Sequence, residues 1–491
     1  MLAYHFPPLA SAGVFRPLRF VRYLPEFGWP PIVLTALPEN ENERQDFSLM
    51  DKVPPGVTVV RTGLWQPEAR IRSWLRFGRR PERVASHTLA AVPSISPARD
   101  TPPDGLRGMM RGLARNVHDL AFMTPDDRVW WMGPAVAAAM RLVREYRPRV
   151  LFTTGPPHSI HLIGLVLKRL TGLPLVIDFR DPWSRRPWGK KPRNPWGQRL
   201  LGHLERLCVR YADRVILNSH NLGRDFRKHY GARHAQKFTV IPNGYDPEML
   251  HVVEQLAAGM GQNRKGGPLR LCHPGSLYRR RDPRPILAAV KQLVDRGRPV
   301  IFEQIGHCES AAEVQSFVER NRLDEHVRME GPVPHENIIR RMAAADVLMV
   351  VQPENALQVP GKLFEMMMFR KPIVALADEG ETAEIVEKYH LGAVARSNDA
   401  GAIAACIERA GELSAARCRE NGWASALAAY DGRQLTGDLA EVFCELVDGD
   451  DKSRARPGKR QGERQPDIGP ALTTVGRQSK ENATSSRLCA V

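Results

Sequence analysis

Short apolar runs alternate with amphipathic stretches along the first half of the chain. The runs are four to six residues long, and between them lie segments with apolar residues at three- and four-residue spacing. This alternation is typical of a parallel sheet covered by helices. The pattern predicts strands at Leu2–Phe6, Pro31–Ala36, Val57–Arg61, Arg149–Thr153, Pro174–Asp178, Arg214–Asn218 and Thr239–Pro242.

The second half of the chain repeats this rhythm. It predicts strands at Leu269–His273, Val300–Ile305, Val327–Glu330, Val347–Val351, Pro372–Ala375 and Gly392–Ala395. Helical patterns again separate the apolar runs. We therefore expect two α/β domains, each built on a doubly wound parallel sheet.

A glycine-rich stretch marks the boundary between the two domains. Residues 256–268 contain four glycines and few residues that could build a core, as is typical of a flexible linker. We expect an N-terminal domain over 1–255 and a C-terminal domain over 269–447. From 448 to 491 the apolar pattern is lost, and residues 451–491 carry nine basic and four acidic side chains. That composition predicts a disordered basic tail.

An insertion over residues 62–127 interrupts the alternation in the N-terminal domain. Within it, residues 105–123 place apolar side chains at helical spacing, with Arg107, Arg111 and Arg115 off that stripe. The segment predicts a basic amphipathic helix. Two interpretations stay open: the helix packs on the sheet, or it contacts an anionic membrane surface.

The composition narrows the classes of partner and location. The 71 Lys and Arg residues against 54 Asp and Glu give a net charge of +17, which favours anionic partners. No run of about 18 uncharged apolar residues is present, and Pro7 and Pro8 interrupt any signal-peptide core. The seven cysteines are scattered and never spaced as Cys-x-x-Cys. We therefore expect a cytoplasmic protein without a metal site.

Eight segments in a fixed order carry a resemblance to a known family. They are YHFPPLASAGVFRPLRFVRYLPEFGW, TTGPPHSIHLIGL, DFRDPW, ADRVILNS, VIPNGYD, GSLYRRRDP, ADVLMVV and VPGKLFEMMMFRKPIVAL. From residue 2 to about residue 430, the chain resembles a glycosyltransferase of the GT-B fold and is most similar to family 4, the retaining nucleotide-sugar transferases. The resemblance implies two Rossmann-like domains facing a cleft, the first binding the acceptor and the second the nucleotide sugar.

The segment GSLYRRRDP is suited to holding a diphosphate. Gly275 follows the first strand of the C-terminal domain and lets the backbone approach phosphate closely. Arg281 and, next to it, Arg280 can give charge-assisted, bidentate contacts to phosphate oxygens. The alternative interpretation is that these arginines lie in a solvated loop, as runs of arginines in other proteins usually do.

The segment VPGKLFE predicts a second anion site. Gly361 and Lys362 begin a helix after a strand, where free amides and the helix dipole favour negative charge. Glu365 lies one turn later and can accept hydrogen bonds from a ribose diol; the alternative is an ordinary solvated Lys362–Glu365 pair. In the family, a first glutamate contacts the sugar, but here its position is Leu357, with Glu354 as a nearby substitute.

The N-terminal domain offers candidates for the other side of the cleft. Gly13 follows the first strand and allows a close approach below the donor phosphate. By resemblance, His158 falls near a histidine that touches the transferred sugar. Asp181 in DFRDPW can accept a proton or hold an acceptor hydroxyl, whereas Asp178 fits better an Asp–Arg pair that organises the turn. Asn243 and Gly244 signal a turn at which the two lobes pivot.

The resemblance implies transfer of a sugar from a nucleotide-sugar donor to a saccharide or lipid-linked acceptor, with retention of configuration, in polysaccharide or glycolipid biosynthesis. No cofactor or metal is expected, because the cationic side chains can neutralise the leaving diphosphate. The location fits the inner membrane face if residues 105–123 bind lipid. Two alternatives stay open: a nucleotide-sugar 2-epimerase of the same fold, and a non-catalytic binder of nucleic acid or another anionic surface. Nucleic acid is not the expected partner, since no basic groove with interleaved aromatics is evident.

Overall fold

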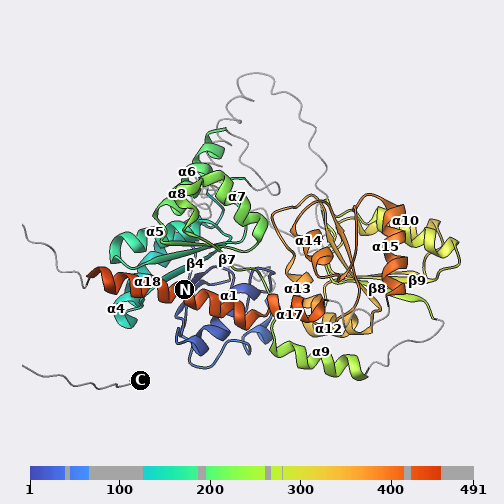
Figure 1. Ribbon diagram of the computed structural model, residues 1–491, viewed down its shortest axis with the longest axis horizontal. Helices are drawn as coiled ribbons and strands as arrows, with labels where there is room; N and C mark the ends of the chain where they lie inside the picture. The colour runs from blue at the N-terminus through green and yellow to red at the C-terminus, as the bar shows by residue number, and fades with distance from the viewer. Residues whose placement is uncertain are drawn as a thin grey trace, which may run out of the picture. The chain divides into compact units, whose positions relative to one another are not determined.

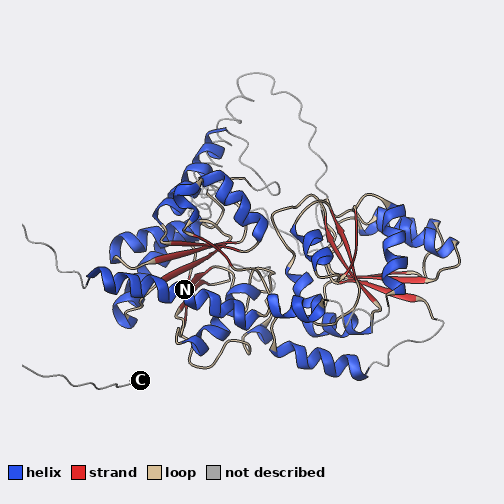
Figure 2. Ribbon diagram, in the orientation of Figure 1, coloured by secondary structure: helices blue, strands red, loops and turns tan. Residues whose placement is uncertain are grey.

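The computed structural model describes residues 1–38, 45–65, 125–185, 195–259, 267–278, 280–413 and 422–454. Within these ranges the chain forms two parallel sheets covered by helices (Figure 1 and Figure 2). We call each sheet, together with the helices packed on it, the first lobe and the second lobe. The predicted GT-B architecture of two Rossmann-like lobes is confirmed.

The first lobe is built on a seven-stranded sheet with the order β3-β2-β1-β4-β5-β6-β7. Every neighbouring pair is parallel. The strands are β1 (Leu2–Ala3), β2 (Val33–Ala36), β3 (Val59–Thr62), β4 (Leu151–Gly155), β5 (Leu175–Phe179), β6 (Arg214–Leu217) and β7 (Phe238–Val240). The order reverses between β1 and β4, which places a topological switch point at the carboxyl ends of these two strands.

Helices of the first lobe connect these strands. They are α1 (Phe15–Tyr23), α4 (Met132–Tyr146), α5 (Ser159–Thr171), α6 (Pro195–Tyr211), α7 (His220–Tyr230) and α8 (Ala232–Ala235), with 3-10 turns η1 (Leu24–Phe27), η2 (Phe47–Leu49) and η3 (Val129–Trp131). Local signals set their ends. Ser219 caps the start of α7 by accepting a hydrogen bond from the Leu222 amide at 3.1 Å, and Gly172, with φ 73°, ends α5 in the left-handed conformation.

The second lobe is built on a six-stranded parallel sheet with the order β10-β9-β8-β11-β12-β13. The strands are β8 (Leu269–His273), β9 (Val300–Ile305), β10 (Val327–Glu330), β11 (Val347–Gln352), β12 (Ile373–Ala377) and β13 (Gly392–Ala395). The helices that follow residue 247 are α9 (Glu248–Gly259), α10 (Arg284–Asp295), α11 (Ala311–Arg320), α12 (His335–Ala344), α13 (Gly361–Met367), α14 (Glu381–Lys388), α15 (Ala400–Glu412), α17 (Trp423–Ala429) and α18 (Gly432–Arg454). Here the switch point lies between β8 and β11.

Two helices pack on a different lobe from the one that the sequence predicts. Leu439 and Phe443 of α18 join a core with Phe20, Phe152 and other residues of the first sheet, so this helix covers the first lobe (Figure 1). The predicted range 269–447 for the C-terminal domain is corrected on this point. Because α18 continues to Arg454, helical structure also passes position 448, where the sequence predicted the tail to begin.

Helix α9 shows the reverse case: it begins in the range predicted for the N-terminal domain but packs on the second lobe. Val253 of this helix is buried with Ile339 and Met342 of α12 in a core of the second lobe. The first lobe therefore ends before α9 and not at residue 255. The sequence assigned both segments only through the glycine-rich boundary at 256–268, and such a boundary does not say which sheet a neighbouring helix will cover.

Two crossings between the lobes fall within the described part of the chain, and they lie side by side. The Tyr245 amide donates to the Tyr430 carbonyl at 3.1 Å, and the Gly432 amide donates to the Tyr245 carbonyl at 3.0 Å. The approach is close, because a Cβ at Gly244 would lie 2.3 Å from the Tyr430 oxygen. The turn predicted at Asn243 and Gly244 thus belongs to a paired crossing.

The insertion lies mostly outside the described residues. Its helix predicted over 105–123, with Arg107, Arg111 and Arg115, falls in the range 66–124, and the tail after Arg454 is likewise not described. The amphipathic helix and the disordered tail therefore stay predictions.

Candidate functional site

The predicted phosphate residues of the second lobe lie at its switch point. Gly275 follows β8, and Gln352 is the last residue of β11, the adjacent strand. Arg281 spans these two strand ends: its Nη2 donates to Gln352 Oε1 at 2.7 Å and its Nη1 to the Ser276 carbonyl at 3.4 Å. Ligands of doubly wound sheets bind at this location.

Arg281 is held in a fixed position by its surroundings. Its guanidinium carbon lies 5.1 Å from the centre of the Tyr278 ring, and burial lowers the pKa of this guanidinium. An arginine is still protonated at neutral pH under such a shift. The site therefore presents a partly desolvated positive charge, which attracts an anion more strongly than a solvated one does.

Arg280 occupies a different environment. Its side chain is 66% exposed and forms an ion pair with Glu354, the residue considered as the substitute for the missing first glutamate. Glu354 has a positive φ of 51°, and its amide donates to Asp378 Oδ2 at 2.9 Å. The structure therefore brings Arg280 and Glu354 together, and Arg280 is more exposed to solvent than the half-buried Arg281. Arg279 lies outside the described residues.

A charged cluster lies at the start of α13. Lys362 Nζ donates to Glu365 Oε2 at 2.9 Å, and His335 Nε2 lies 3.2 Å from the same oxygen. Burial would raise the pKa of Glu365, but Lys362 and His335 outweigh burial and lower it to about 2. Glu365 is therefore an ionised acceptor at neutral pH, and its carboxylate has lone pairs beyond those that these two partners use.

Gly361 is the first residue of α13 and is exposed. A Cβ at this position would meet nothing within 4 Å. The space beside the helix start is thus open. His335 was not singled out in the sequence, because one histidine at the start of a predicted helix carries no signal. Its place beside Glu365 depends on the fold.

The first lobe places its candidates at the corresponding switch point. Arg180 links the loops after β1 and β4: it donates to the carbonyls of Gly13 at 2.6 Å, Gly155 at 2.8 Å and Pro156 at 3.1 Å. Gly13 is therefore tied to this network through its backbone. A Cβ there would lie 3.1 Å from the His5 ring, so a larger residue would crowd the loop.

His158 and Asp181 lie on neighbouring strand ends. His158 precedes α5, is 2% exposed, and its ring stacks on Trp183 at 5.2 Å with an interplanar angle of 23°. Asp181 is 8% exposed and accepts a hydrogen bond from Gln358 of the second lobe. Asp181 thus contacts the loop of the second lobe that carries Leu357.

Asp178 is structural, as the sequence favoured, but its partner is Arg16 of α1. Nε and Nη2 of Arg16 donate to the two carboxylate oxygens at 2.9 and 2.8 Å, and Thr154 Oγ1 donates at 2.7 Å. Burial would raise the pKa of Asp178, but the charge and hydrogen bonds of Arg16 outweigh burial and lower it. Arg16 also donates to the carbonyls of Ile241 and Pro242 at 2.8 and 3.0 Å, so this pair also holds the strand that leads to the first crossing.

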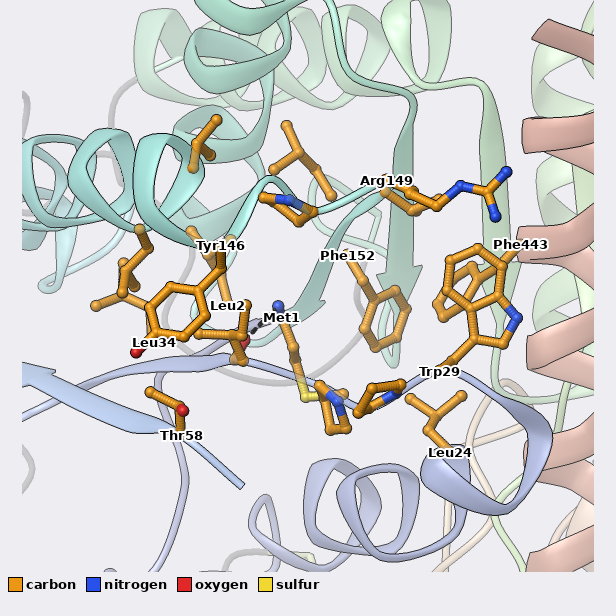
Figure 3. Close-up of a pocket in the computed structure, with 18 of the residues that line it drawn as sticks. Met1, Leu2, Leu24, Trp29, Leu34, Thr58, Tyr146, Arg149, Phe152 and Phe443 are labelled. Atoms are coloured by element: carbon orange, nitrogen blue, oxygen red, sulfur yellow. Dashed lines mark hydrogen bonds between the residues drawn. The ribbon is translucent and has the colours of Figure 1, made fainter. Parts of the chain in front are cut away.

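A separate cavity of about 710 Å³ lies at the other end of the first sheet. Figure 3 shows Trp29, Phe152 and Phe443 around it, together with Met1 and Tyr146. Its lining residues include those just before β1, β2 and β4, so it opens at the amino ends of these strands. This cavity is distinct from the switch points at which the predicted site residues lie.

Within the described part of the chain, no group of three or more His, Cys, Asp or Glu side chains is arranged to hold a metal ion. No helix there is long and apolar enough to cross a bilayer.

Comparison with known proteins assigns both halves of the chain. Residues 92–249 match the model of Glycosyltransferase Family 4, and residues 268–412 match that of the Glycosyl transferases group 1. A 2-deoxystreptamine glucosyltransferase from Streptomyces kanamyceticus is 25% identical over 259 residues, which cover 50% of this chain and 64% of that protein. The chain thus spans less than two thirds of the length of this relative.

Solved structures show the same fold. A sucrose-phosphate synthase from Thermosynechococcus elongatus superimposes with a TM-score of 0.60 at 15% identity, covering 91% of this chain and 98% of that one. Anabaena HepE in complex with UDP-glucose gives a TM-score of 0.58 at 16% identity, covering 90% and 98%. With two family models that together cover more than half of its length, the chain belongs to the family 4-like glycosyltransferases of the GT-B fold.

Proposed function

We propose that this glycosyltransferase binds a nucleotide-sugar donor at the switch point of its second lobe and transfers the sugar to a saccharide or lipid-linked acceptor held by the first lobe. The observation that carries the proposal is the Arg281–Gln352 contact of 2.7 Å, which fixes a half-buried cation across the ends of β8 and β11. Donor complexes of similar proteins, such as HepE with UDP-glucose, support a nucleotide sugar as the ligand.

The diphosphate of the donor would be held by Arg281 and Lys362. Charge accumulates on the leaving diphosphate as the glycosidic bond breaks, so cations fixed beside it stabilise the transition state more than the ground state. Arg280 would add a solvent-exposed cation when it exchanges Glu354 for phosphate. We propose that these side chains replace a metal ion in neutralising the leaving group.

The ribose would be bound by Glu365. Its lowered pKa keeps the carboxylate ionised, and an ionised carboxylate accepts strong hydrogen bonds from a diol. Lys362 and His335 orient that carboxylate from one side. The rigid placement reduces the entropy lost when the nucleoside binds.

The first lobe would present the acceptor. His158, fixed against Trp183, is proposed to contact the transferred sugar, and Asp181 is proposed to hold the acceptor hydroxyl or to take its proton. Retention of configuration and a role in polysaccharide or glycolipid biosynthesis belong to the same proposal and rest on the family resemblance.

A thermal-shift screen of UDP-, GDP- and ADP-sugars tests the donor site. A ligand present at about 100 times its Kd stabilises the native state by about 2.7 kcal/mol, so one class should raise the Tm clearly. Arg281→Ala and Lys362→Ala should each abolish that rise. The matched controls are Arg284→Ala, which removes an exposed arginine paired with Asp282, and Lys291→Ala, which removes an exposed lysine paired with Asp295.

If both site variants respond to the sugar nucleotide as the wild type does, the donor site is misplaced. The same sugar nucleotide, incubated without an acceptor, separates a transferase from a 2-epimerase. A transferase leaves the sugar unchanged or hydrolyses it slowly, whereas an epimerase converts it.

A further inference from the structure

The amino end of α7 contacts the second lobe through three consecutive residues. Ser219 Oγ donates to the Leu357 carbonyl at 2.7 Å, and Asn221 Nδ2 donates to the Ala356 carbonyl at 2.9 Å. The amides of His220 and Asn221 donate to the two carboxylate oxygens of Glu381 at 2.9 and 2.7 Å. We call residues 219–221 the α7 clamp.

Glu381 completes the capping of a helix that belongs to the other lobe. The first amides of a helix have no partner within the helix. Ser219 satisfies the Leu222 amide, and Glu381, the first residue of α14, satisfies the two amides before it. Glu381 is 3% exposed, and a carboxylate so placed also interacts favourably with the helix dipole. Glu381, a residue of the second lobe, is therefore hydrogen-bonded to backbone amides of the first lobe.

The pKa of Glu381 agrees with this role. Burial would raise it, but the hydrogen bonds from His220 and Asn221 outweigh burial and lower it. Arg224 and Glu384 form an exposed ion pair nearby at 3.1 Å, which contributes little on its own. The buried contacts, rather than this pair, carry the interaction between α7 and α14.

The clamp holds loop 356–358, which lies between β11 and α13. The loop is also packed against the start of α14, since a Cβ at Gly380 would lie 2.7 Å from the Ala356 Cα atom. The loop contains Leu357, and its last residue, Gln358, donates to Asp181. Contacts from both lobes therefore set where this loop stands relative to Asp181.

We propose that Asn221 and Glu381 are positioning residues, which fix loop 356–358 against Asp181 and thereby align the donor sugar with the acceptor side of the site. The proposal rests on the proposed function for the identity of the ligands, and it names residues that act through the loop. The residues proposed to hold the nucleotide, Arg281, Lys362 and Glu365, make none of these clamp contacts.

This separation predicts a split between binding and turnover. Loss of a clamp contact should leave the affinity for the free nucleotide within about twofold of wild type and should lower kcat at least tenfold, because misalignment weakens the chemical step more than binding. A merely structural role would instead lower the Tm and leave kcat per folded molecule unchanged.

The test variant is Asn221→Ala, and its matched control is Asn321→Ala. Asn321 Nδ2 makes an equivalent bond to the Phe317 carbonyl at 2.8 Å, entirely within α11 and the turn after it. Nucleotide affinity is measured with UDP, GDP and ADP as probes, and kcat with the donor that the thermal-shift screen identifies. The proposal expects the tenfold loss in Asn221→Ala only; equal kcat values in the two variants would overturn it.

A second measurement needs no ligand. Hydrogen exchange of the His220 and Asn221 amides should rise at least tenfold in Glu381→Ala and stay unchanged in the control Glu387→Ala, which removes an exposed acid of the same helix. Unchanged exchange in Glu381→Ala would overturn the clamp. If the wild type binds none of the sugar nucleotides, the proposed function fails, and the exchange experiment still decides the clamp.

Discussion

Replacing Arg16 with alanine should destabilise the first lobe strongly, because the substitution leaves the buried carboxylate of Asp178 without its counter-charge. Asp178 is 0% exposed and receives two of its three hydrogen bonds from Arg16. Removing one partner of a buried ion pair costs about 3–5 kcal/mol, since the remaining charge is left uncompensated. Arg16→Ala also releases the carbonyls of Ile241 and Pro242, so we expect the upper end of this range.

The pH dependence of the loss follows from the pKa of Asp178. In the wild type the pKa of Asp178 is lowered, so this pair stabilises the fold above the unfolded-state pKa of about 3.9 and the contribution is lost as the pH falls. In Arg16→Ala, burial without a counter-charge raises the pKa above the unfolded value. The loss of folding free energy caused by the uncompensated Asp178 carboxylate is then complete at high pH. It vanishes once Asp178 is protonated in both the folded and the unfolded state. The two stability curves should therefore converge as the pH is lowered.

Urea denaturation at several pH values between about 4 and 8 measures this difference. The double variant Arg16→Ala/Asp178→Asn serves as the control, because it removes the stranded charge and should recover part of the lost stability. A loss below about 1 kcal/mol in Arg16→Ala, or one that does not change with pH, would show that the pair does not carry the stated energy.

Two further predictions address the packing of α18 and the charge of Glu365. Phe443→Ala should cost about 3–5 kcal/mol in urea denaturation, because the ring is 4% exposed and packs on Phe152 and Trp29; Tyr211→Ala, which truncates a half-exposed ring, is the control, and equal effects would contradict the packing. Because the pKa of Glu365 is lowered to about 2, its ionised form stabilises the fold above about pH 4.5 and this contribution is lost as the pH falls towards 2. Glu365→Gln should flatten the acid side of the stability profile, and a slope equal to that of the wild type would argue against it.

The sheets could be predicted from the sequence because their information is local. Runs such as Val347–Val351 are apolar throughout and bounded by polar residues, as buried parallel strands are, and the structure has a strand there, β11. The order of the strands then determines the switch points, so the position of Gly275 and Arg281 at a strand end could be expected.

Contacts between distant segments could not be predicted in the same way. The pair Arg16–Asp178 joins residues 162 positions apart, and nothing near Arg16 in the sequence distinguishes it from Arg19 or Arg22. The sequence likewise assigned all residues up to 447 to the second domain, because nothing local indicates that α18 covers the first sheet. His335 beside Glu365 and Asn221 beside loop 356–358 depend on the same long-range packing.

The return of α18 to the first lobe has a consequence for biosynthesis of the protein. The core that joins Phe20 of α1 to Phe152 and Ile216 of the first sheet is completed only when α18 has been made. A ribosome synthesises the second lobe in between, at about 5–20 residues per second, so this core stays incomplete and part of its apolar surface is exposed for many seconds. We therefore expect chaperones to bind the newly made first lobe. Fragments of the protein that end before α18 should aggregate.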